Sequence, residues 1–434
     1  MGIPSTDYAA GIATLKRFVS TSCIPSETTY DEHVAQFHGA DRWSFECVPP
    51  VLEHLKSEAK TLGLWNLFAP LSFRRQFNSS TSTPPPPNSL QTIPLSVKQY
   101  AEISLILGSS TLAPEACNCS APDTGNMEVL MHYGDDAQKQ KYLPKLLEGK
   151  CRSAFLMTEP KVGSSDAMNI ETKIEKRGNE YVINGLKWWS SGAQDPRCEV
   201  FVLMGRIVVD SNIKSTEQRS HSLHTMIIVP RHLPGVEMVR PCTVFGADDA
   251  PHGHAMVRLT NVRVKQSEAI LLGEGRGFEI AQGRLGPGRV HHCMRAIGCA
   301  QRAYEMMITR AGSRVTFGSS LLSKDLVRAM ISESFADLEA ARLITEECAR
   351  RIDEFGAKGA RTYIQMIKYE VPARCLNVVD RAIQVWGGGG VDNMFLVKSF
   401  AYMRCLRIAD GPDEVHRISV GVSEGRRVLR DSRL

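Results

Sequence analysis

The sequence predicts an α+β fold in which a helical segment, a β-rich segment and a second helical segment follow one another along 434 residues. Three observations lead to this prediction. Apolar residues recur at helical spacing in the first third of the chain, short β-branched runs replace them in the middle, and helical spacing then returns. A chain of this length forms about two or three lobes rather than one core. We therefore divide it into residues 1–152, 153–272 and 273–434.

The first segment, residues 1–152, is expected to be a helical domain. Apolar residues recur at helical spacing in Val51–Leu64 and again in Val97–Leu107. Between these two stretches lie four consecutive prolines, Pro84–Pro87, which cannot continue a helix. The proline-containing stretch is therefore predicted to be an exposed surface loop.

The second segment, residues 153–272, is expected to be an antiparallel β domain. Its β-rich runs are Tyr181–Ile183, Val200–Met204, His224–Val229 and Ala255–Leu259. Arg177-Gly178-Asn179 and Asn184-Gly185 are sequences typical of tight turns, so each is predicted to connect two strands.

The third segment, residues 273–434, is expected to be a bundle of long helices. Apolar side chains recur at helical spacing in Leu326–Ile344, and a similar pattern continues in Arg361–Trp386. The whole chain is thus expected to have helical, β and helical domains in that order.

Composition limits the classes of function. The 52 Lys and Arg residues exceed the 47 Asp and Glu residues by only five and are spread along the chain, which argues against a nucleic-acid binder. The twelve cysteines are scattered without a CxxC pair, so reduced intracellular thiols are expected. No apolar run is long enough for a membrane span, and neither a membrane span nor a secretory signal is expected. His291 and His292 are adjacent and lack metal-ligand spacing, so no metal site is expected.

Two motifs in the middle segment carry groups suited to a flavin. Met157-Thr158-Glu159-Pro160, followed by Gly163-Ser164-Ser165, offers hydroxyl and backbone N–H groups to flavin carbonyls and a pyrophosphate. A turn followed by a helix cap would use the same residues. Lys187-Trp188-Trp189-Ser190-Ser191-Gly192 supplies an indole that can cover a planar isoalloxazine, although paired tryptophans are more often core residues.

Two further motifs lie in the third segment. The glycines of Gln384–Gly390 would let the backbone approach a ligand closely, or they simply form a helix C-cap and turn. In Ile408–Glu414, Asp410 lies between an apolar stretch and a helix start suggested by Pro412. Asp410 is therefore either a helix N-cap or a partly buried base.

The order of these motifs resembles the acyl-CoA dehydrogenase family from about Tyr8 to Val428. The matching stretches are Met157–Pro160, Trp189–Ser191, Arg314–Gly318, Gln384–Gly388 and Asp410-Gly411. Other stretches are similar to the branch that contains animal family members ten and eleven, namely Ala121–Glu128, Arg284–Arg289 and Ala409–His416. In that branch a kinase-like domain often precedes the dehydrogenase, and no such domain is expected in this chain.

The resemblance implies the acyl-CoA dehydrogenase fold, with an N-terminal helical domain, a central antiparallel β domain and a C-terminal four-helix bundle. It also implies a homodimer or homotetramer that binds FAD between the β domain and the bundle. Carried over by position, the residues expected to contact FAD are Met157, Thr158, Ser164, Trp189, Ser191, Arg314, Phe317, Gln384, Gly387, Gly388, Pro412 and Glu414. Those expected to contact substrate are Ser164, Arg289 and Gly411.

The activity implied by the resemblance is α,β-dehydrogenation of an acyl-CoA thioester, with Asp410 taking the α-proton and flavin N5 taking the β-hydride. Most family members have Glu at this position, and Asp is one methylene shorter, so the carboxylate is expected to retract by about 1 Å or more. The electron acceptor is either an electron-transfer flavoprotein or O2. Two alternatives remain: a flavin oxidase acting on an acyl-CoA or another carbon acid such as a nitroalkane, and a flavin-bound protein without turnover.

The sequence ends in Ser432-Arg433-Leu434, a close variant of the Ser-Lys-Leu peroxisomal address. We therefore expect import into peroxisomes, and a cytoplasmic location if the tripeptide is not used.

Overall fold

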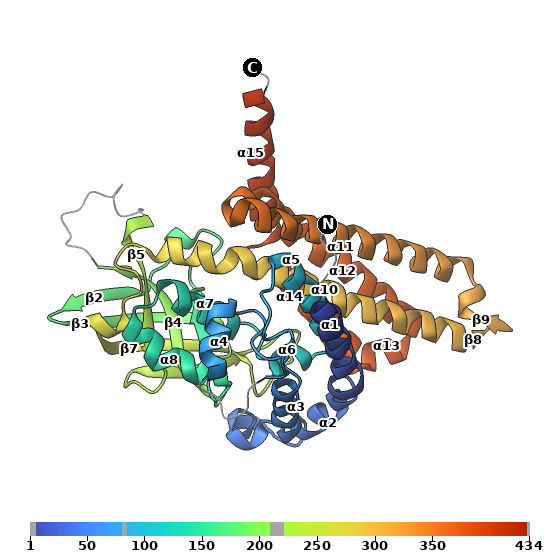
Figure 1. Cartoon of the computed structure of the whole chain (residues 1–434), viewed down its shortest axis with the longest axis horizontal. Coiled ribbons are helices and arrows are strands. Elements are labelled where there is room, and N and C mark those ends of the chain that lie inside the picture. The colour runs from blue at the N-terminus through green and yellow to red at the C-terminus, as the bar shows by residue number, and fades with distance from the viewer. Residues whose placement is uncertain (1–5, 80–84, 209–220, 432–434) are drawn as a thin grey trace. The chain divides into compact units, whose positions relative to one another are not determined.

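A computed structural model describes residues 6–79, 85–208 and 221–431 of the chain (Figure 1). The chain forms two compact units. Unit 1 consists of residues 1–27, 87–114 and 286–434, and unit 2 consists of residues 28–86 and 115–285. Each unit therefore combines parts of the chain that are far apart in the sequence.

Unit 2 contains a β-sheet and short helices. Its helices are residues 28–34 of α2 (Ser26–Val34), α3 (Pro50–Thr61), α4 (Leu71–Ser79), α7 (Asp123–Tyr133), α8 (Asp136–Glu148), α9 (Gln266–Ala269) and residues 277–285 of α10 (Gly277–Ser313). Its strands are β1 (Arg152–Leu156), β2 (Lys173–Arg177), β3 (Glu180–Ser191), β4 (Cys198–Ile207), β5 (His224–Pro230), β6 (Val236–Cys242) and β7 (His254–Lys265). These elements confirm the predicted β-rich middle of the chain.

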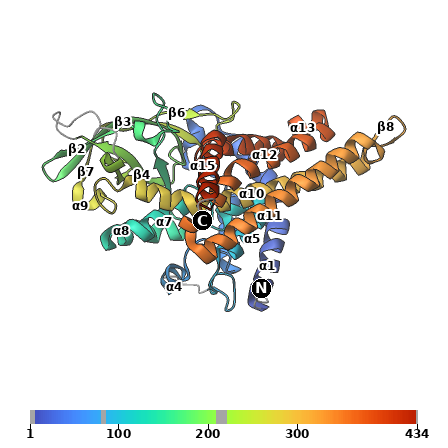
Figure 2. The same ribbon diagram turned by 90° about the horizontal axis from the view of Figure 1, so that it is seen from above.

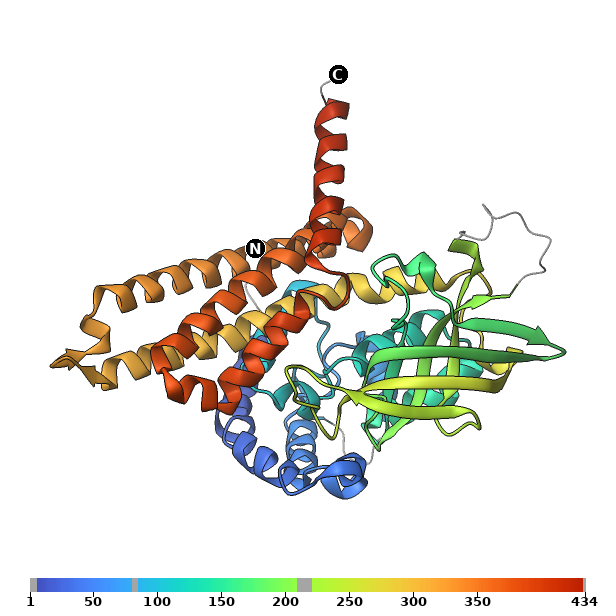
Figure 3. The same ribbon diagram turned by 180° about the vertical axis from the view of Figure 1, so that it is seen from behind.

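The strands form one sheet (Figure 3), with the order β1-β4-β2-β3-β7-β6 and with β5 paired to β4. The pairs β2–β3, β3–β7, β6–β7 and β4–β5 are antiparallel, whereas β1–β4 and β2–β4 are parallel. The expected antiparallel domain is thus a mixed sheet. The sequence pattern could not show this, because strand direction depends on connections that cross the sheet.

One of the two predicted turns is correct. Gly178, at φ +63°, connects β2 to β3. The Asn184-Gly185 turn is wrong, because both residues lie inside β3 at a register shift opposite β7. A Cβ at Gly185 would lie 2.3 Å from the Thr172 hydroxyl oxygen, so this glycine permits close packing within the sheet.

Unit 1 is helical. Its elements are α1 (Thr6–Phe18), α5 (Val97–Gly108), α11 (Asp325–Gly359), α12 (Arg361–Trp386), α13 (Gly388–Asp392), α14 (Met394–Leu406), α15 (Asp413–Asp431), residues 286–313 of α10 (Gly277–Ser313), and the hairpin strands β8 (Val315–Thr316) and β9 (Ser319–Ser320). The short helix α6 (Ala113–Ala116) crosses the boundary between the units. Helices α10 and α11 run side by side to the β8–β9 hairpin that joins them (Figure 2).

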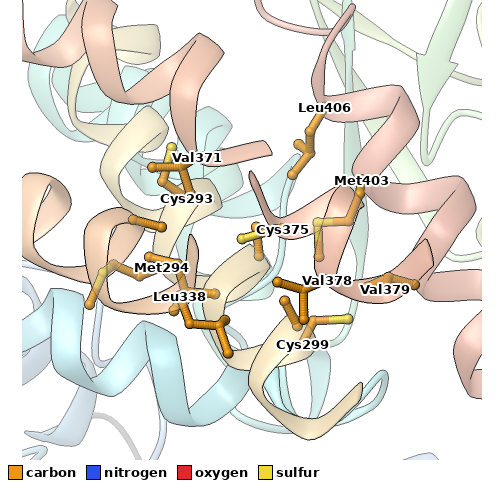
Figure 4. Close-up of a cluster of buried hydrophobic side chains, with 14 of the residues drawn as sticks. Cys293, Met294, Cys299, Leu338, Val371, Cys375, Val378, Val379, Met403 and Leu406 are labelled. Atoms are coloured by element: carbon orange, nitrogen blue, oxygen red, sulfur yellow. The ribbon is translucent and has the colours of Figure 1, made fainter. Parts of the chain in front are cut away.

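Four helices, α10, α11, α12 and α14, surround the core of unit 1 and confirm the expected bundle. Buried side chains of all four meet there, including Cys293, Leu338, Val378 and Met403 (Figure 4). Helix α15 starts against α12 and then extends away from the other helices of this unit (Figures 1 and 3).

Two glycines allow α5 and α10 to cross closely. A Cβ at Gly108 would lie 2.2 Å from the carbonyl oxygen of Arg295, and one at Gly298 would lie 1.9 Å from that of Leu105. Both distances are far shorter than real carbon contacts, so only glycine fits. The backbone of α10 is therefore firmly held around Arg295.

The twelve cysteines all lie among the described residues and none is in a disulfide bond, and all but Cys405 are buried. Burial raises the pKa of Cys151 and of Cys293 to about 12, and that of Cys299 to about 11. Among the described residues, no helix combines the length and apolar character needed to cross a bilayer.

Candidate functional site

In unit 2, the predicted flavin-contacting residues occupy the edge of the sheet where β1 ends. Met157 and Thr158 follow β1 directly, and the Thr158 carbonyl accepts a hydrogen bond from the Trp188 N–H of β3 at 3.1 Å. The Ser164 hydroxyl folds back onto residue 159, accepting from the Glu159 N–H at 3.1 Å and donating to the Glu159 carbonyl at 3.4 Å. The two motifs are therefore joined in space.

A buried ion pair supports this turn. The Lys187 ammonium, fully buried, donates to the Glu159 carboxylate at 2.8 Å, to the Met157 carbonyl at 2.9 Å and to the Met204 carbonyl at 2.7 Å. Burial lowers the pKa of Lys187 to about 8, although Glu159 opposes this shift. Burial alone would raise the pKa of Glu159, but the Lys187 charge lowers it below the ordinary value. The pair fixes the backbone on both sides of Thr158.

The Trp189 indole is presented at the surface by a break in the strand pairing. The β3–β7 register shifts between Lys187 and Ser190, and Trp189 itself has φ +52°. As a result its side chain is 40% exposed, and its ring lies 5.6 Å from that of His254. The Ser191 hydroxyl is 2.8 Å from His254 Nδ1. An exposed indole beside a hydroxyl is suited to bind a planar heterocycle with hydrogen-bond acceptors on its edge. The predicted flavin is such a heterocycle.

Burial lowers the pKa of His254; His252 adds to the shift and Asp249 opposes it. The imidazole beside Ser191 is therefore neutral near pH 7.

In unit 1, Asp410 lies on the turn between α14 and α15. Its φ is +56°, and α15 starts only at Asp413, so the alternative role of helix N-cap is wrong. The Arg289 guanidinium donates to the Asp410 carbonyl at 3.1 Å, and His416 Nε2 lies 3.2 Å from the same oxygen. His292 Nε2 is 3.6 Å from the Asp410 carboxylate.

The side chains around this turn are buried cations and histidines. Lys368 donates to the carbonyls of Leu406 and Gly411. Burial lowers the pKa of Lys368 and of Arg289, and the Asp410 charge opposes both shifts. Burial, reinforced by Arg289 and Lys368, lowers the pKa of His416 to about 4, so this imidazole is neutral at pH 7.

Arg289 was predicted to line the substrate pocket, and the structure places it directly beside the Asp410 turn. It is buried, and its Nε has no hydrogen-bond partner within the described part of the chain. A buried N–H group without a partner is costly unless a ligand or water satisfies it. Gly411, Pro412 and Glu414 follow on the same turn and at the start of α15.

The other predicted FAD contacts lie far from Asp410 within unit 1. These are Arg314, Phe317, Gln384, Gly387 and Gly388, and all five are exposed. Sixteen residues of α12 separate Lys368, next to the Asp410 turn, from Gln384, which corresponds to a rise of about 24 Å. Phe317, at the tip of the β8–β9 hairpin, is 99% exposed. The structure thus does not bring these five residues to Asp410 of the same chain.

The glycine motif begins with a helix C-cap, as one of its two interpretations predicted. Gly387, at φ +64°, is the C-cap of α12, but the residues after it form the short helix α13 instead of a turn. Within the described part of the chain and outside the adjacent backbone, no atom would lie within 4 Å of a Cβ at Gly387 or Gly388. Their backbone is therefore open to a ligand.

Several residues of the site were not assigned a role from the sequence. Glu159 and Lys187 lie within the two motifs of the middle segment, and His416 lies within Ala409–His416. Lys368 was missed, although a lone lysine between Ile364, Ile367 and Val371 on the buried face of a helix was a usable signal.

Comparison with known proteins identifies the family. Family models match residues 154–262 (acyl-CoA dehydrogenase, middle domain) and 275–423 (acyl-CoA dehydrogenase, C-terminal domain). FadE2, a Mycobacterium tuberculosis protein assigned to this family, is 44% identical over 94% of this chain and 93% of its own length. The chain belongs to the acyl-CoA dehydrogenase family. Acyl-CoA dehydrogenase family member 11 of Gallus gallus is 48% identical over 93% of this chain, and family member 10 of Mus musculus is 45% identical over 94%.

The predicted similarity to the branch of members ten and eleven is thereby confirmed. The chain spans 48% and 36% of the lengths of these two animal relatives. Among solved structures, a Mycobacterium abscessus protein assigned to the acyl-CoA dehydrogenases has a TM-score of 0.88 and 39% identity, covering 98% of this chain and all of the other. The FAD complex of PigA has a TM-score of 0.77 and 19% identity, covering 98% and 100%, which shows the same fold.

Proposed function

We propose that this chain catalyses FAD-dependent α,β-dehydrogenation of an acyl-CoA thioester, with Asp410 as the base. The observation that carries the proposal is the Asp410 turn. Its carbonyl is held by the buried Arg289, while its carboxylate side chain is 29% exposed. A carboxylate on a fixed backbone that still reaches solvent is suited to accept a proton from a bound carbon acid.

FAD is the proposed hydride acceptor. Trp189, Ser191 and Thr158 supply an indole, a hydroxyl beside a neutral imidazole, and a turn fixed by the Lys187–Glu159 pair. PigA, which has this fold, is solved with FAD. When bound, the flavin supplies a two-electron acceptor, and the chain's own part is to hold the ring and deliver the carboxylate.

The deciding experiment is an anaerobic titration of the purified flavoprotein with a panel of acyl-CoAs, following flavin absorbance. We expect at least one acyl-CoA to bleach the flavin in the wild type and none to do so in Asp410→Asn, which retains FAD. Equal reduction rates in both proteins would remove Asp410 from the mechanism. Failure of every acyl-CoA would favour the flavin-bound protein without turnover.

The electron acceptor is decided by a second measurement. If the reduced wild type forms hydrogen peroxide stoichiometrically in air, the chain is an oxidase. If it stays reduced until an electron-transfer flavoprotein is added, it is a dehydrogenase. We propose the dehydrogenase, in line with the family of the chain.

We further propose a homodimer or homotetramer in which a neighbouring subunit supplies Arg314, Phe317, Gln384, Gly387 and Gly388 to the cofactor. The distance of these residues from Asp410 within one chain supports this. So do the exposed apolar residues near the same end of α11, such as Leu322 and Leu326. Sedimentation should therefore give a mass of two or four chains, and a monomer that binds FAD at full affinity would contradict the proposal.

Finally, we propose peroxisomal import through Ser432-Arg433-Leu434, a tripeptide outside the described residues. A fluorescent protein fused in front of the full chain should enter peroxisomes, and the same fusion without the last three residues should stay in the cytoplasm. Equal distribution of the two would contradict the address.

A further inference from the structure

Three side chains of α10 form a row that leads to Asp410. Arg289, His292 and Arg295 follow at intervals of three residues, and hence lie on one side of the helix. Arg289 binds the Asp410 carbonyl, while His292 Nε2 lies 3.6 Å from the Asp410 carboxylate. Arg295 Nη2 lies 3.1 Å from His292 Nδ1.

The contact with Arg295 determines where the His292 ring carries its proton. A guanidinium can only donate hydrogen bonds, so His292 Nδ1 must be the acceptor. The ring proton is then on Nε2, the nitrogen that faces the Asp410 carboxylate. A second proton on Nδ1 would point at the guanidinium, so Arg295 opposes protonation of the ring, whereas the Asp410 carboxylate on the other side favours it.

Arg295 is itself held rigidly. Its side chain is buried, and its backbone is in contact with α5 at Gly108, where any larger residue would collide. Among the described residues, the charged and titratable groups around the Asp410 turn and His292 include Arg289 and Arg295 on α10, Lys368 on α12, Tyr402 on α14 beside Arg295, and Asp413 and His416 on α15.

These groups act on different atoms of residue 410. Arg289 and His416 contact its backbone carbonyl, whereas His292 lies next to its carboxylate. Rotation of an aspartate carboxylate about its last torsion is only weakly restricted, so its plane is set by its partners. An N–H dipole fixed on a rigid helix 3.6 Å from the carboxylate therefore favours one orientation of it electrostatically.

We infer that the Arg295–His292 pair is a positioning device for Asp410: Arg295 fixes the ring proton of His292 on Nε2, and the Nε2–H dipole, 3.6 Å away, orients the carboxylate electrostatically for proton abstraction. The inference rests on the proposed function of Asp410. It assigns His292 and Arg295 as positioning residues, since they act through Asp410.

The kinetic test measures flavin reduction by a saturating acyl-CoA in anaerobic stopped flow. His292→Ala should slow reduction about 10- to 100-fold with FAD content and substrate affinity unchanged, because a small misplacement of a catalytic group costs up to about 100-fold. His292→Gln, which keeps an N–H donor, should recover most of the rate. The matched control is His291→Gln: this neighbour packs edge-on against Tyr100 instead, and it should reduce at the wild-type rate.

A double-mutant cycle separates positioning from general packing. Arg295→Leu should slow reduction by a similar factor, and the double variant His292→Ala/Arg295→Leu should be no slower than His292→Ala alone. Factors that multiply, or a His292→Ala protein as fast as an active wild type, would overturn the inference.

A second test does not need turnover. Deuterium exchange at the imidazole C2 position, read by mass spectrometry, reports the protonation of each histidine. In the His291→Gln background, His292 should be neutral at pH 7, and adding Arg295→Leu should raise its midpoint. An imidazolium at pH 7 with Arg295 present would overturn the inference, even if no acyl-CoA reduced the flavin and the proposed function had failed.

Discussion

Replacement of Lys187 by methionine tests whether the buried ion pair holds the turn at the end of β1. Methionine keeps much of the length of the side chain but removes three hydrogen bonds, to Met157, Glu159 and Met204. The Glu159 carboxylate is then left buried without its counter-ion. It keeps the donors of Thr172 and Glu171.

The size of the effect follows from these contacts. Removal of one partner of a buried pair costs about 3–5 kcal/mol, and the remaining donors to Glu159 place this case near 3 kcal/mol. With a guanidinium dependence of about 5 kcal/mol per molar, the unfolding midpoint should fall by about 0.6 M. Lys141→Met is the matched control, because the pair Lys141–Glu268 is about half exposed and worth at most about 1 kcal/mol.

Tryptophan fluorescence is a suitable assay, since four of the five tryptophans, all except Trp386, belong to unit 2. The double variant Lys187→Met/Glu159→Gln should lose less stability than Lys187→Met, because it leaves no unpaired charge. Equal midpoints for Lys187→Met and Lys141→Met would refute the reasoning.

Three further predictions concern the proposed site and assembly. Because burial and the cations Arg289 and Lys368 lower the pKa of His416 to about 4, stability should fall as pH drops from about 6.5 to about 4. Over this pH range the His416→Gln variant should lose about 1–2 kcal/mol less unfolding free energy than the wild type, as measured from denaturant midpoints. An unchanged pH dependence in the variant would contradict the prediction. Trp189→Ala should raise the FAD dissociation constant, measured by ultrafiltration, about tenfold. An unchanged dissociation constant would show that the indole does not contact the ring. Leu326→Asp should shift sedimentation toward smaller species; an unchanged mass would place this exposed leucine outside the interface.

Local patterns predicted the regular elements well. The helical spacing in Val97–Leu107 corresponds to α5, and the β-rich run Val200–Met204 lies within β4. In both cases the period of apolar residues reports directly which face is buried. The turn predicted at Asn184-Gly185 was wrong, because the glycine is required by close contact with Thr172, which is distant in sequence, and not by a turn.

The candidate site, too, was predicted only where the local sequence pattern determines it. Asp410 and Trp189 were identified from their motifs, but the register shift that exposes Trp189 depends on β7, more than sixty residues away. The partners of Asp410 on α10 lie more than a hundred residues before it. Such contacts leave no local period in the sequence, so only the folded chain reveals them.

The buried thiols have a consequence for a flavoprotein that meets oxygen. Thiolates, rather than thiols, react with peroxide, and burial keeps the pKa of Cys151, Cys293 and Cys299 far above physiological pH. Any peroxide released when a reduced flavin is oxidised by air would therefore find few reactive sulfurs on the intact chain. Apart from the partly exposed Cys405, alkylation of cysteines would in turn mark only molecules that have unfolded, and so measure the fraction of enzyme that has been lost.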